Sequence, residues 1–232
     1  MPSEPRLAVV TGTSSGIGRA VAGRLLADRW RVTGLDRAPA TITHAGFAGV
    51  AVDLTDGTAL GRCVAGLGVP QALVHAAGVL RTGRAGEASA DDARLMWQLH
   101  VEAASRLADT LLPRMAEAGA GRVVLLGSRV SRGMAGRGQY AASKAALATL
   151  ARSWAAEVVA RGVTVNVVSP AATDTAMLAD PARAGTQPQV PPIGRLIRAD
   201  EVAALVAFLL SDAAEALTGQ DISLCGGASL PR

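Results

Sequence analysis

The chain has 232 residues, a formal net charge of +4 and an isoelectric point of about 10, and 50% of its residues are hydrophobic. A chain of this length can form one domain with a substantial buried core. Glycine, proline or charge interrupts every apolar stretch before it reaches membrane-spanning length, and the short polar start, 1–6, lacks the pattern of a signal peptide. The arginines are dispersed among acidic residues, and Cys63 and Cys225 have no metal-ligand spacing. We therefore expect a soluble, cytoplasmic protein with buried thiols and without nucleic-acid, membrane or metal partners.

Short apolar runs alternate with amphipathic segments along the chain. The predicted strands are 7–10, 31–36, 49–53, 72–76, 122–127, 163–168 and 221–225. The predicted helices are 16–29, 55–67, 91–118, 139–161 and 200–211. This alternation predicts an α/β fold, a Rossmann-like doubly wound parallel sheet of about seven strands with helices on both faces, in a single domain over 1–232. Prolines at 181, 188, 191 and 192 make the segment near 175–193 the least regular, and we expect a loop or a short lid there.

A glycine-rich turn joins the first predicted strand to the first predicted helix. It reads Thr11-Gly12-Thr13-Ser14-Ser15-Gly16-Ile17-Gly18. Glycine permits a tight turn and close approach of the backbone to a ligand, and a helix N-terminus offers N–H groups and a positive dipole end to a pyrophosphate. In this strand–turn–helix context the motif predicts dinucleotide binding. The candidate residues are Gly12, Ser14, Ser15, Gly16, Ile17 and Gly18.

Acidic residues end the second and third predicted strands. Asp36 can bond the adenosine ribose hydroxyls, and its charge repels the extra phosphate of NADP, so NAD is the predicted cofactor. Arg37 can accept that phosphate, which keeps NADP as the alternative. Asp53, followed by Leu54, is either a ligand of the adenine amino group or the N-cap of the helix predicted from Thr55.

The single tyrosine and the single lysine of the chain lie four residues apart at the start of a predicted helix. They are Tyr140 and Lys144, and every other one of the 23 basic residues is arginine. Residues i and i+4 share one helix face, and a nearby ammonium lowers the pKa of a phenol from about 10. The phenol can then act as general acid or base for an alcohol–ketone pair. Ser128, at the end of the fifth predicted strand, can bond the substrate oxygen beside it, and Ser131 is a weaker candidate for that role.

Taken together, these residues resemble those of the short-chain dehydrogenase/reductase family over essentially the whole chain. The resemblance implies that Ser128, Tyr140 and Lys144 are catalytic. It also implies that the run Asn166–Pro170 and the residues after it hold the nicotinamide end of the cofactor. The remaining cofactor-binding residues implied by the motifs are Leu54, Ala77, Gly78, Pro170, Thr173 and Thr175, with Tyr140 and Lys144 again. The family further implies a homotetramer or homodimer, often paired through the helix that carries Tyr140. On that helix Leu147, Leu150, Ala151, Trp154 and Val158 fit one buried face.

Three departures from the family pattern affect the candidate site. His75 stands in the family's Asn-Asn-Ala-Gly motif, and we expect it to hydrogen-bond within the sheet. His100 stands where the family has a fourth catalytic residue, an asparagine. Because the pKa of histidine is near neutrality, His100 either relays protons or packs inertly. Ala171 replaces a glycine, and the loop between Ser128 and Tyr140 is one residue short, which concerns substrate fit more than reaction type.

The expected substrate is a small alcohol or ketone. Local strings such as 32–36 and 76–81 resemble the 2,3-dihydro-2,3-dihydroxybenzoate dehydrogenases, which favours a ring alcohol or diol. Arginines that follow two predicted strands make an anionic substrate a second hypothesis, with solvated rim charge as its alternative; they are Arg81, Arg84, Arg129, Arg132 and Arg137. The rival functions are a ketoacyl-thioester reductase and a catalytically silent NAD-binding regulatory protein.

Overall fold

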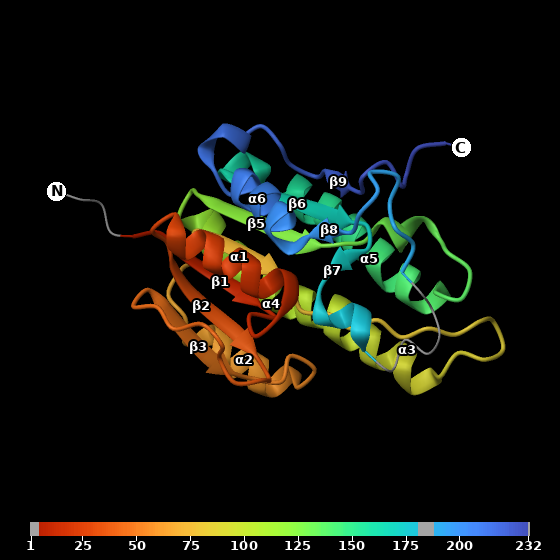
Figure 1. Cartoon of the computed structure of the whole chain (residues 1–232). Helices are drawn as coiled ribbons and strands as arrows, with labels where there is room; N and C mark the ends of the chain where they lie inside the picture. The colour runs from red at the N-terminus through yellow and green to blue at the C-terminus, as the bar shows by residue number, and fades with distance from the viewer. Residues whose placement is uncertain (1–4, 181–187, 232) are drawn as a thin grey trace.

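The computed structural model describes residues 5–180 and 188–231, and a parallel sheet runs through its centre (Figure 1). The strand order is β3-β2-β1-β4-β5-β6-β9, and every neighbouring pair is parallel. The strands are β1 (Leu7–Thr11), β2 (Arg31–Asp36), β3 (Phe47–Ala51), β4 (Ala72–His75), β5 (Gly121–Leu126), β6 (Val163–Pro170) and β9 (Asp221–Leu224). The predicted seven-stranded, doubly wound α/β fold is therefore confirmed.

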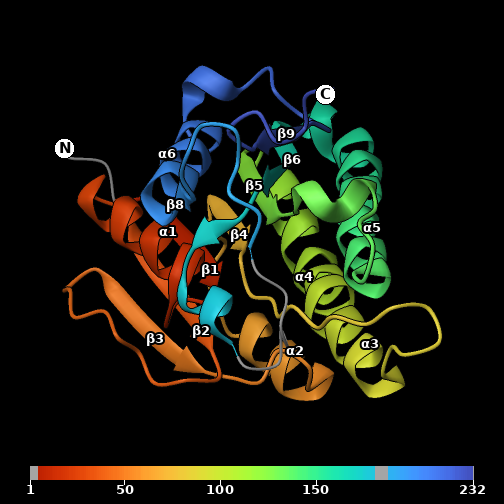
Figure 2. The same cartoon turned by 45° about the vertical axis from the view of Figure 1, so that its right-hand side comes forward.

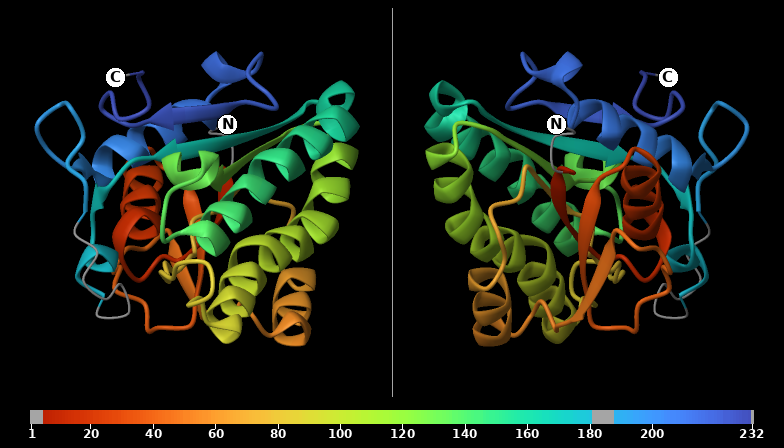
Figure 3. Two further views of the ribbon diagram at one scale, coloured as in Figure 1. Left: turned by 90° about the vertical axis from the view of Figure 1, so that its right-hand side faces the viewer. Right: turned by 90° about the vertical axis from the view of Figure 1, so that its left-hand side faces the viewer.

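Helices cover both faces of this sheet. The α-helices are α1 (Gly16–Ala27), α2 (Gly57–Ala65), α3 (Ala90–Trp97), α4 (Ala103–Glu117), α5 (Gly138–Val158) and α6 (Ala199–Leu209). Figure 3 shows α1 and α6 on one face and α4 and α5 on the other. Four of the five positions predicted to form a buried face of α5 are buried, and Leu150 is partly buried against the same core.

The core divides into two layers because successive strand residues point to opposite faces of the sheet. On β1, Val9 packs under α4 and α5, whereas Ala8 and Val10 pack under α1 and α6. Val163, Val165 and Val167 of β6 join the first layer in the same way. Since both faces of the central strands β1, β4, β5 and β6 are covered, these strands form continuous apolar runs in the sequence, which is why they were predicted well.

The strand order places the ligand-binding crevice. The chain moves from β1 outward to β3 and then returns to β4 on the other side of β1. In such sheets ligands bind outside the carboxyl ends of the strands, at this reversal. The residues that follow β1, β4, β5 and β6 are therefore brought to one edge from four separate parts of the sequence.

The predicted helix 91–118 is present as one continuous helical segment over 90–117, but it is not α-helical throughout. It consists of α3, a π-helical turn at Gln98–Glu102 and α4. A π-turn carries one extra residue per turn, which a hydrophobic period of 3.6 does not reveal. The other helices and strands lie within a few residues of their predicted bounds, and α5 continues as a 3-10 turn, Val159–Arg161.

A small second sheet was not predicted. Its two parallel strands are β7 (Thr173–Asp174) and β8 (Ile197–Arg198), which lie apart from the main sheet (Figure 2). Two residues per strand are too few for a sequence pattern to indicate. Part of the predicted lid near 175–193, residues 181–187, lies outside the described residues, and the part before it forms a 3-10 helix, Ala176–Ala179.

Two expectations from composition can be compared with the structure. Cys63 and Cys225 are free thiols, as expected. Both are only partly buried, so the prediction that they are buried is wrong. Within the described ranges, none of the helices combines the length and the apolar character needed to cross a membrane.

Candidate active site

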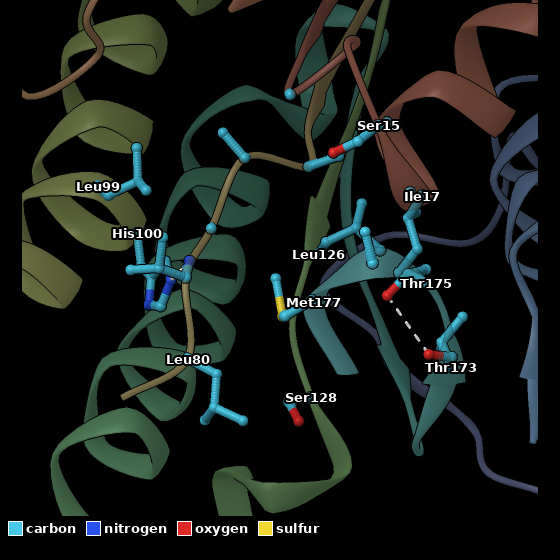
Figure 4. A pocket seen from close by; sticks show the side chains of 18 of the residues that line it. Ser15, Ile17, Leu80, Leu99, His100, Leu126, Ser128, Thr173, Thr175 and Met177 are labelled. Atoms are coloured by element: carbon cyan, nitrogen blue, oxygen red, sulfur yellow. Dashed lines mark hydrogen bonds between the residues drawn. The ribbon is translucent and has the colours of Figure 1, made fainter. Parts of the chain in front are cut away.

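A pocket of about 790 Å³ opens at the carboxyl edge of the sheet. Its size is that of a typical small-molecule site. The residues predicted to bind the cofactor or to take part in catalysis line it, apart from the weaker candidate Ser131: Gly12, Ser14, Ser15, Gly16, Ile17, Gly18, Asp36, Arg37, Asp53, Leu54, Ala77, Gly78, His100, Ser128, Tyr140, Lys144, Pro170, Thr173 and Thr175. Figure 4 shows Ser15 and Ile17 on one side, His100 and Leu80 on the opposite side, and Met177 between them. The fold thus brings the predicted residues together, while their individual roles stay predictions.

The glycine turn makes a cradle that side chains would fill. Gly12 has φ +75°, and a Cβ there would lie 3.0 Å from the backbone of Ala77. A Cβ on Gly18 would collide with the carbonyl of Gly12. Ser15, the N-cap of α1, makes no side-chain bond to the first turn of the helix. The open backbone and the uncapped helix end fit the pyrophosphate of a dinucleotide.

Asp36 is fixed at the end of β2 by two backbone donors. The N–H of Ser14 donates to Oδ2 and the N–H of Ala38 donates to Oδ1, both at 2.9 Å. Each carboxylate oxygen keeps further acceptor capacity toward the pocket. This arrangement suits bonding to a pair of ribose hydroxyls.

Asp53 is not the N-cap of α2, so that alternative is corrected. The N-cap is Asp56, whose side chain accepts from Thr58 and Ala59. Asp53 instead accepts from both the N–H and the hydroxyl of Thr55 in a local turn, and these bonds hold its pKa below the ordinary value. The helix starts later than predicted because 53–56 forms this turn first.

Lys144 is buried beneath Tyr140. Its Nζ donates to the carbonyl oxygen of Leu126 at 2.7 Å and lies 6.0 Å from the centre of the Tyr140 ring. Burial lowers the pKa of Lys144 to about 7, because a charged ammonium is costly to remove from water. The lysine therefore sits where its charge acts on the phenol with little screening.

Ser128 lies two residues beyond the end of β5 and is 7% exposed. Its Oγ accepts from the N–H of Val130 at 3.2 Å, so its own hydroxyl proton remains available as a donor. Ser131, in the same loop, does not line the pocket in the described structure. The tertiary structure thus favours Ser128 over Ser131 as the serine near the substrate.

His100 is held in one tautomer by partners on both ring nitrogens. The N–H of Val79 donates to Nε2 at 3.1 Å, so Nδ1 carries the proton and donates to Oγ of Ser143 at 2.9 Å. That serine in turn donates to the carbonyl of Tyr140 at 2.9 Å. Burial, followed by the charge of Lys144, keeps the pKa of His100 well below 6.5. The geometry favours inert packing over proton relay, and the catalytic assignment stays a prediction.

His75 bonds within the sheet, as predicted. Its Nδ1 lies 3.0 Å from Oγ1 of Thr11 on the neighbouring strand, and its Nε2 lies 3.1 Å from the carbonyl of Leu99. Since the carbonyl only accepts, Nε2 carries the proton, and Thr11 donates to Nδ1. The oxygen of Thr11 also accepts from the N–H groups of Ala76 and Ala77, which fixes the strand end beside the glycine turn.

Several pocket residues were missed by sequence reasoning. The apolar wall includes Leu80, Leu95, Met134, Met177 and Leu178. They come from segments with no common motif, although Met177 follows the predicted Thr175 by two residues. Of the five arginines considered for an anionic substrate, Arg81, Arg129 and Arg137 line the pocket. Arg84 and Arg132 are exposed and lie outside its lining.

Comparison with known proteins agrees with this geometry. A family model described as Enoyl-(Acyl carrier protein) reductase matches residues 12–229. The 3-oxoacyl-(acyl-carrier-protein) reductase FabG of Salmonella typhimurium is 36% identical over 241 residues, covering 98% of both chains. The 2,3-dihydro-2,3-dihydroxybenzoate dehydrogenase of Escherichia coli K12 is 34% identical over 238 residues, covering 95% of this chain and 96% of that one. A solved structure described as a short chain dehydrogenase/reductase family protein has a TM-score of 0.89 at 30% identity, covering 98% of both chains. The chain therefore belongs to the short-chain dehydrogenase/reductase family of oxidoreductases, which act on CH–OH groups.

Proposed function

We propose that this protein interconverts a secondary alcohol and a ketone with NAD, and that Tyr140 moves the hydroxyl proton. The observation that carries the proposal is the meeting of Ser128, Tyr140 and Lys144 in the pocket that also holds the glycine turn and Asp36. When bound, the nicotinamide supplies or accepts the hydride. The protein positions the substrate and handles the proton.

Tyr140 is the proposed general acid in reduction and general base in oxidation. The neighbouring ammonium of Lys144 favours the phenolate form of Tyr140. The hydrogen bond from Nζ to the carbonyl oxygen of Leu126 holds that ammonium in a fixed position near the ring. Ser128 is proposed to donate its hydroxyl proton to the substrate oxygen, because its Oγ already accepts a hydrogen bond from the N–H of Val130. Apolar side chains from Leu80 and Met177 would limit water around the reacting carbon.

NAD is the proposed cofactor, rather than NADP, because Asp36 places a carboxylate at the end of β2 within the pocket. A negative charge there disfavours an additional phosphate on the ribose. Arg37, the next residue, is exposed and also lines the pocket. Its charge supports NADP as the alternative cofactor, so the two cofactors are compared directly in the test below.

Two substrate classes have specific support. The relative named as a dihydrodihydroxybenzoate dehydrogenase supports a ring alcohol or diol. The relatives named as 3-oxoacyl-(acyl-carrier-protein) reductases support reduction of a ketoacyl thioester as a second candidate. A homodimer or homotetramer also stays a prediction, which light scattering of the purified protein would decide.

The test is cofactor turnover with a panel of cyclic alcohols, cyclic diols, hydroxy acids and acetoacetyl-coenzyme A, each with the NAD and NADP forms. Tyr140→Phe should lower kcat/KM by about 10²- to 10⁴-fold. Ser128→Ala should also lower it, while Ser131→Ala, in the same loop but away from the pocket, should not. Wild-type turnover in Tyr140→Phe would overturn the mechanism. Tight cofactor binding with no turnover on any substrate would instead favour the silent regulatory protein.

A further inference from the structure

The acidic side chains that line the pocket are confined to one end of it, where Arg37 also lies. In the part of the chain that the structure describes, the carboxylates lining the pocket are Asp36, the last residue of β2, and Asp53, which follows β3. The opposite end is lined by Arg81, Arg129 and Arg137 and by no acidic residue in the described ranges. A concave site with a cationic end attracts anions. The next question is whether any of these arginines remains uncompensated.

Arg81 is already neutralised by carboxylates. Its Nη1 lies 3.1 Å from Asp180, and its Nε lies 3.5 Å from Asp92. These ion pairs tie the segment after β4 to α3 and to the chain beyond the 3-10 helix. Arg81 therefore stabilises the wall of the pocket. Its positive charge is largely compensated by these two carboxylates.

Arg129 has no such compensation. Its one hydrogen bond within the described structure runs from Nη1 to the carbonyl of Ala228, and at 3.3 Å it is long for a guanidinium bond. Its Nε is buried and has no acceptor among the described residues. A guanidinium has five donors, and a partly buried one without an anionic partner is energetically unfavourable. The side chain is thus suited to gain a carboxylate when a ligand enters.

The position of Arg129 relates this charge to the reacting group. It directly follows Ser128, and it begins the 3-10 helix Arg129–Arg132 for which Ser128 is the N-cap. The pyrophosphate cradle lies on the other side of the pocket, where Figure 4 shows Ser15 and Ile17 away from Ser128. Arg129, which lines the pocket and adjoins Ser128, therefore lies at the substrate end of the pocket rather than beside the phosphates of a dinucleotide.

We propose that Arg129 anchors a carboxylate of the substrate, so that the protein acts on a small hydroxy acid or oxo acid. This inference rests on the proposed function for the reaction itself, and adds the chemical class of the substrate. Arg129 would form a charge-assisted, two-point bond to the carboxylate, which also fixes the orientation of the substrate oxygen relative to Ser128. A neutral analogue of the same shape would lose that anchor.

Turnover of 3-oxocyclohexane-1-carboxylate and of its carboxamide tests the proposal. These two ketones differ in charge and hardly in shape. The wild-type kcat/KM should favour the acid by about tenfold or more, since bonds to charged groups contribute at this level. Arg129→Met should lower the acid-to-amide ratio by at least tenfold, and Arg129→Lys should restore part of it. Arg132→Met, on the exposed side of the same 3-10 helix, should keep the wild-type ratio.

Binding of benzoate and benzamide to the NAD complex, measured by calorimetry, gives a readout that needs no turnover. Benzoate should bind more tightly than benzamide in the wild type, and Arg129→Met should abolish the difference; its melting temperature shows whether the variant is folded. Benzoate binding that depends on Arg129, without turnover of any alcohol or ketone, would support the anion site and overturn the proposed reaction. Turnover that depends on Tyr140, with equal use of acid and amide, would overturn the anion site alone.

Discussion

The imidazole ring of His100 stands edge-on to the phenol ring of Tyr140, with ring centroids 5.6 Å apart and planes at 85°. The same histidine is tied to the backbone of Val79 and, through Ser143, to the backbone of Tyr140 itself. His100 thus connects the loop after β4 to the first turns of α5. It supports the orientation of the phenol without offering a nitrogen to solvent.

Replacing His100 by asparagine should lower kcat without changing the shape of the pH profile. The edge-to-face contact with Tyr140 is worth ~0.5–1.5 kcal/mol, so its loss should reduce kcat by about 2- to 12-fold. Because the pKa of His100 lies well below 6.5, the residue stays neutral between pH 6 and 8. The pH profile of kcat/KM in that interval checks this, and disappearance of a titration step in His100→Asn would show that the histidine relays protons.

His100→Phe separates the hydrogen bonds of the histidine from its ring contact. Phenylalanine keeps an aromatic edge toward Tyr140 but leaves the N–H of Val79 without its acceptor. A buried unsatisfied donor costs ~1–3 kcal/mol, and the free energy of unfolding should fall by about that amount. Urea denaturation measures the change, and an unaltered midpoint would mean that the Val79 bond contributes nothing to stability.

Acid should destabilise the protein through His75. Burial, followed by the charge of Lys144, lowers the pKa of His75 to about 3, against an ordinary 6.5. The unfolded chain therefore binds more protons in this interval, so the stabilising contribution is complete above pH 6.5 and is lost as pH falls toward 3. Between pH 6.5 and 5.0 the expected loss is about 2 kcal/mol.

The free energy of unfolding of His75→Asn, measured by urea at those two pH values, should show a smaller loss than the wild type. The matched control is His44→Asn, because His44 lies in an exposed loop. Its loss between the two pH values should equal that of the wild type. An equal loss in His75→Asn as well would show that His75 does not cause the acid sensitivity.

Asp36→Ser should shift cofactor use toward NADP. Removing one negative charge beside the ribose relieves a repulsion of ~1 kcal/mol or more, so the NAD-to-NADP ratio of kcat/KM should fall by about fivefold or more. The ratio is the appropriate measure because Asp36 also fixes the N–H of Ser14. The control is Asp53→Asn, beyond the end of the neighbouring strand, which should leave the NAD-to-NADP ratio close to that of the wild type. An unchanged ratio in Asp36→Ser would remove the basis for preferring NAD.

Two alanine substitutions in α1 should have opposite effects. At Gly18 a Cβ meets the backbone of Gly12, so Gly18→Ala should deform the turn, weaken NAD binding at least tenfold and destabilise the fold. At Gly23 a Cβ has no atom within 4 Å, and alanine there should stabilise the helix by ~0.5–1 kcal/mol. Calorimetric titration with NAD and thermal melting check both, and equal NAD affinity in the two variants would argue against a tight cradle at Gly18.

The sequence by itself determined the features that depend on near neighbours in the chain. The sequence predicts the glycine turn correctly because the strand, the turn and the helix end follow one another in the chain. Tyr140 and Lys144 share a face because four residues make about one helical turn. The buried strands read as apolar runs because helices cover both faces of the sheet. The π-helical turn was missed, since one extra residue hardly alters a periodic pattern.

Only the tertiary structure decided what depends on partners far apart in the chain. The tautomer of His100 follows from Val79 and Ser143, and the neutralisation of Arg81 follows from Asp180. Arg129 looks like any other arginine in the sequence, and its charge stands out only where the fold leaves it without a carboxylate partner. The charge state and the role of these side chains depend on which residues lie near them across the sheet edge and on how far they are removed from water. No local sequence pattern encodes that proximity or that desolvation.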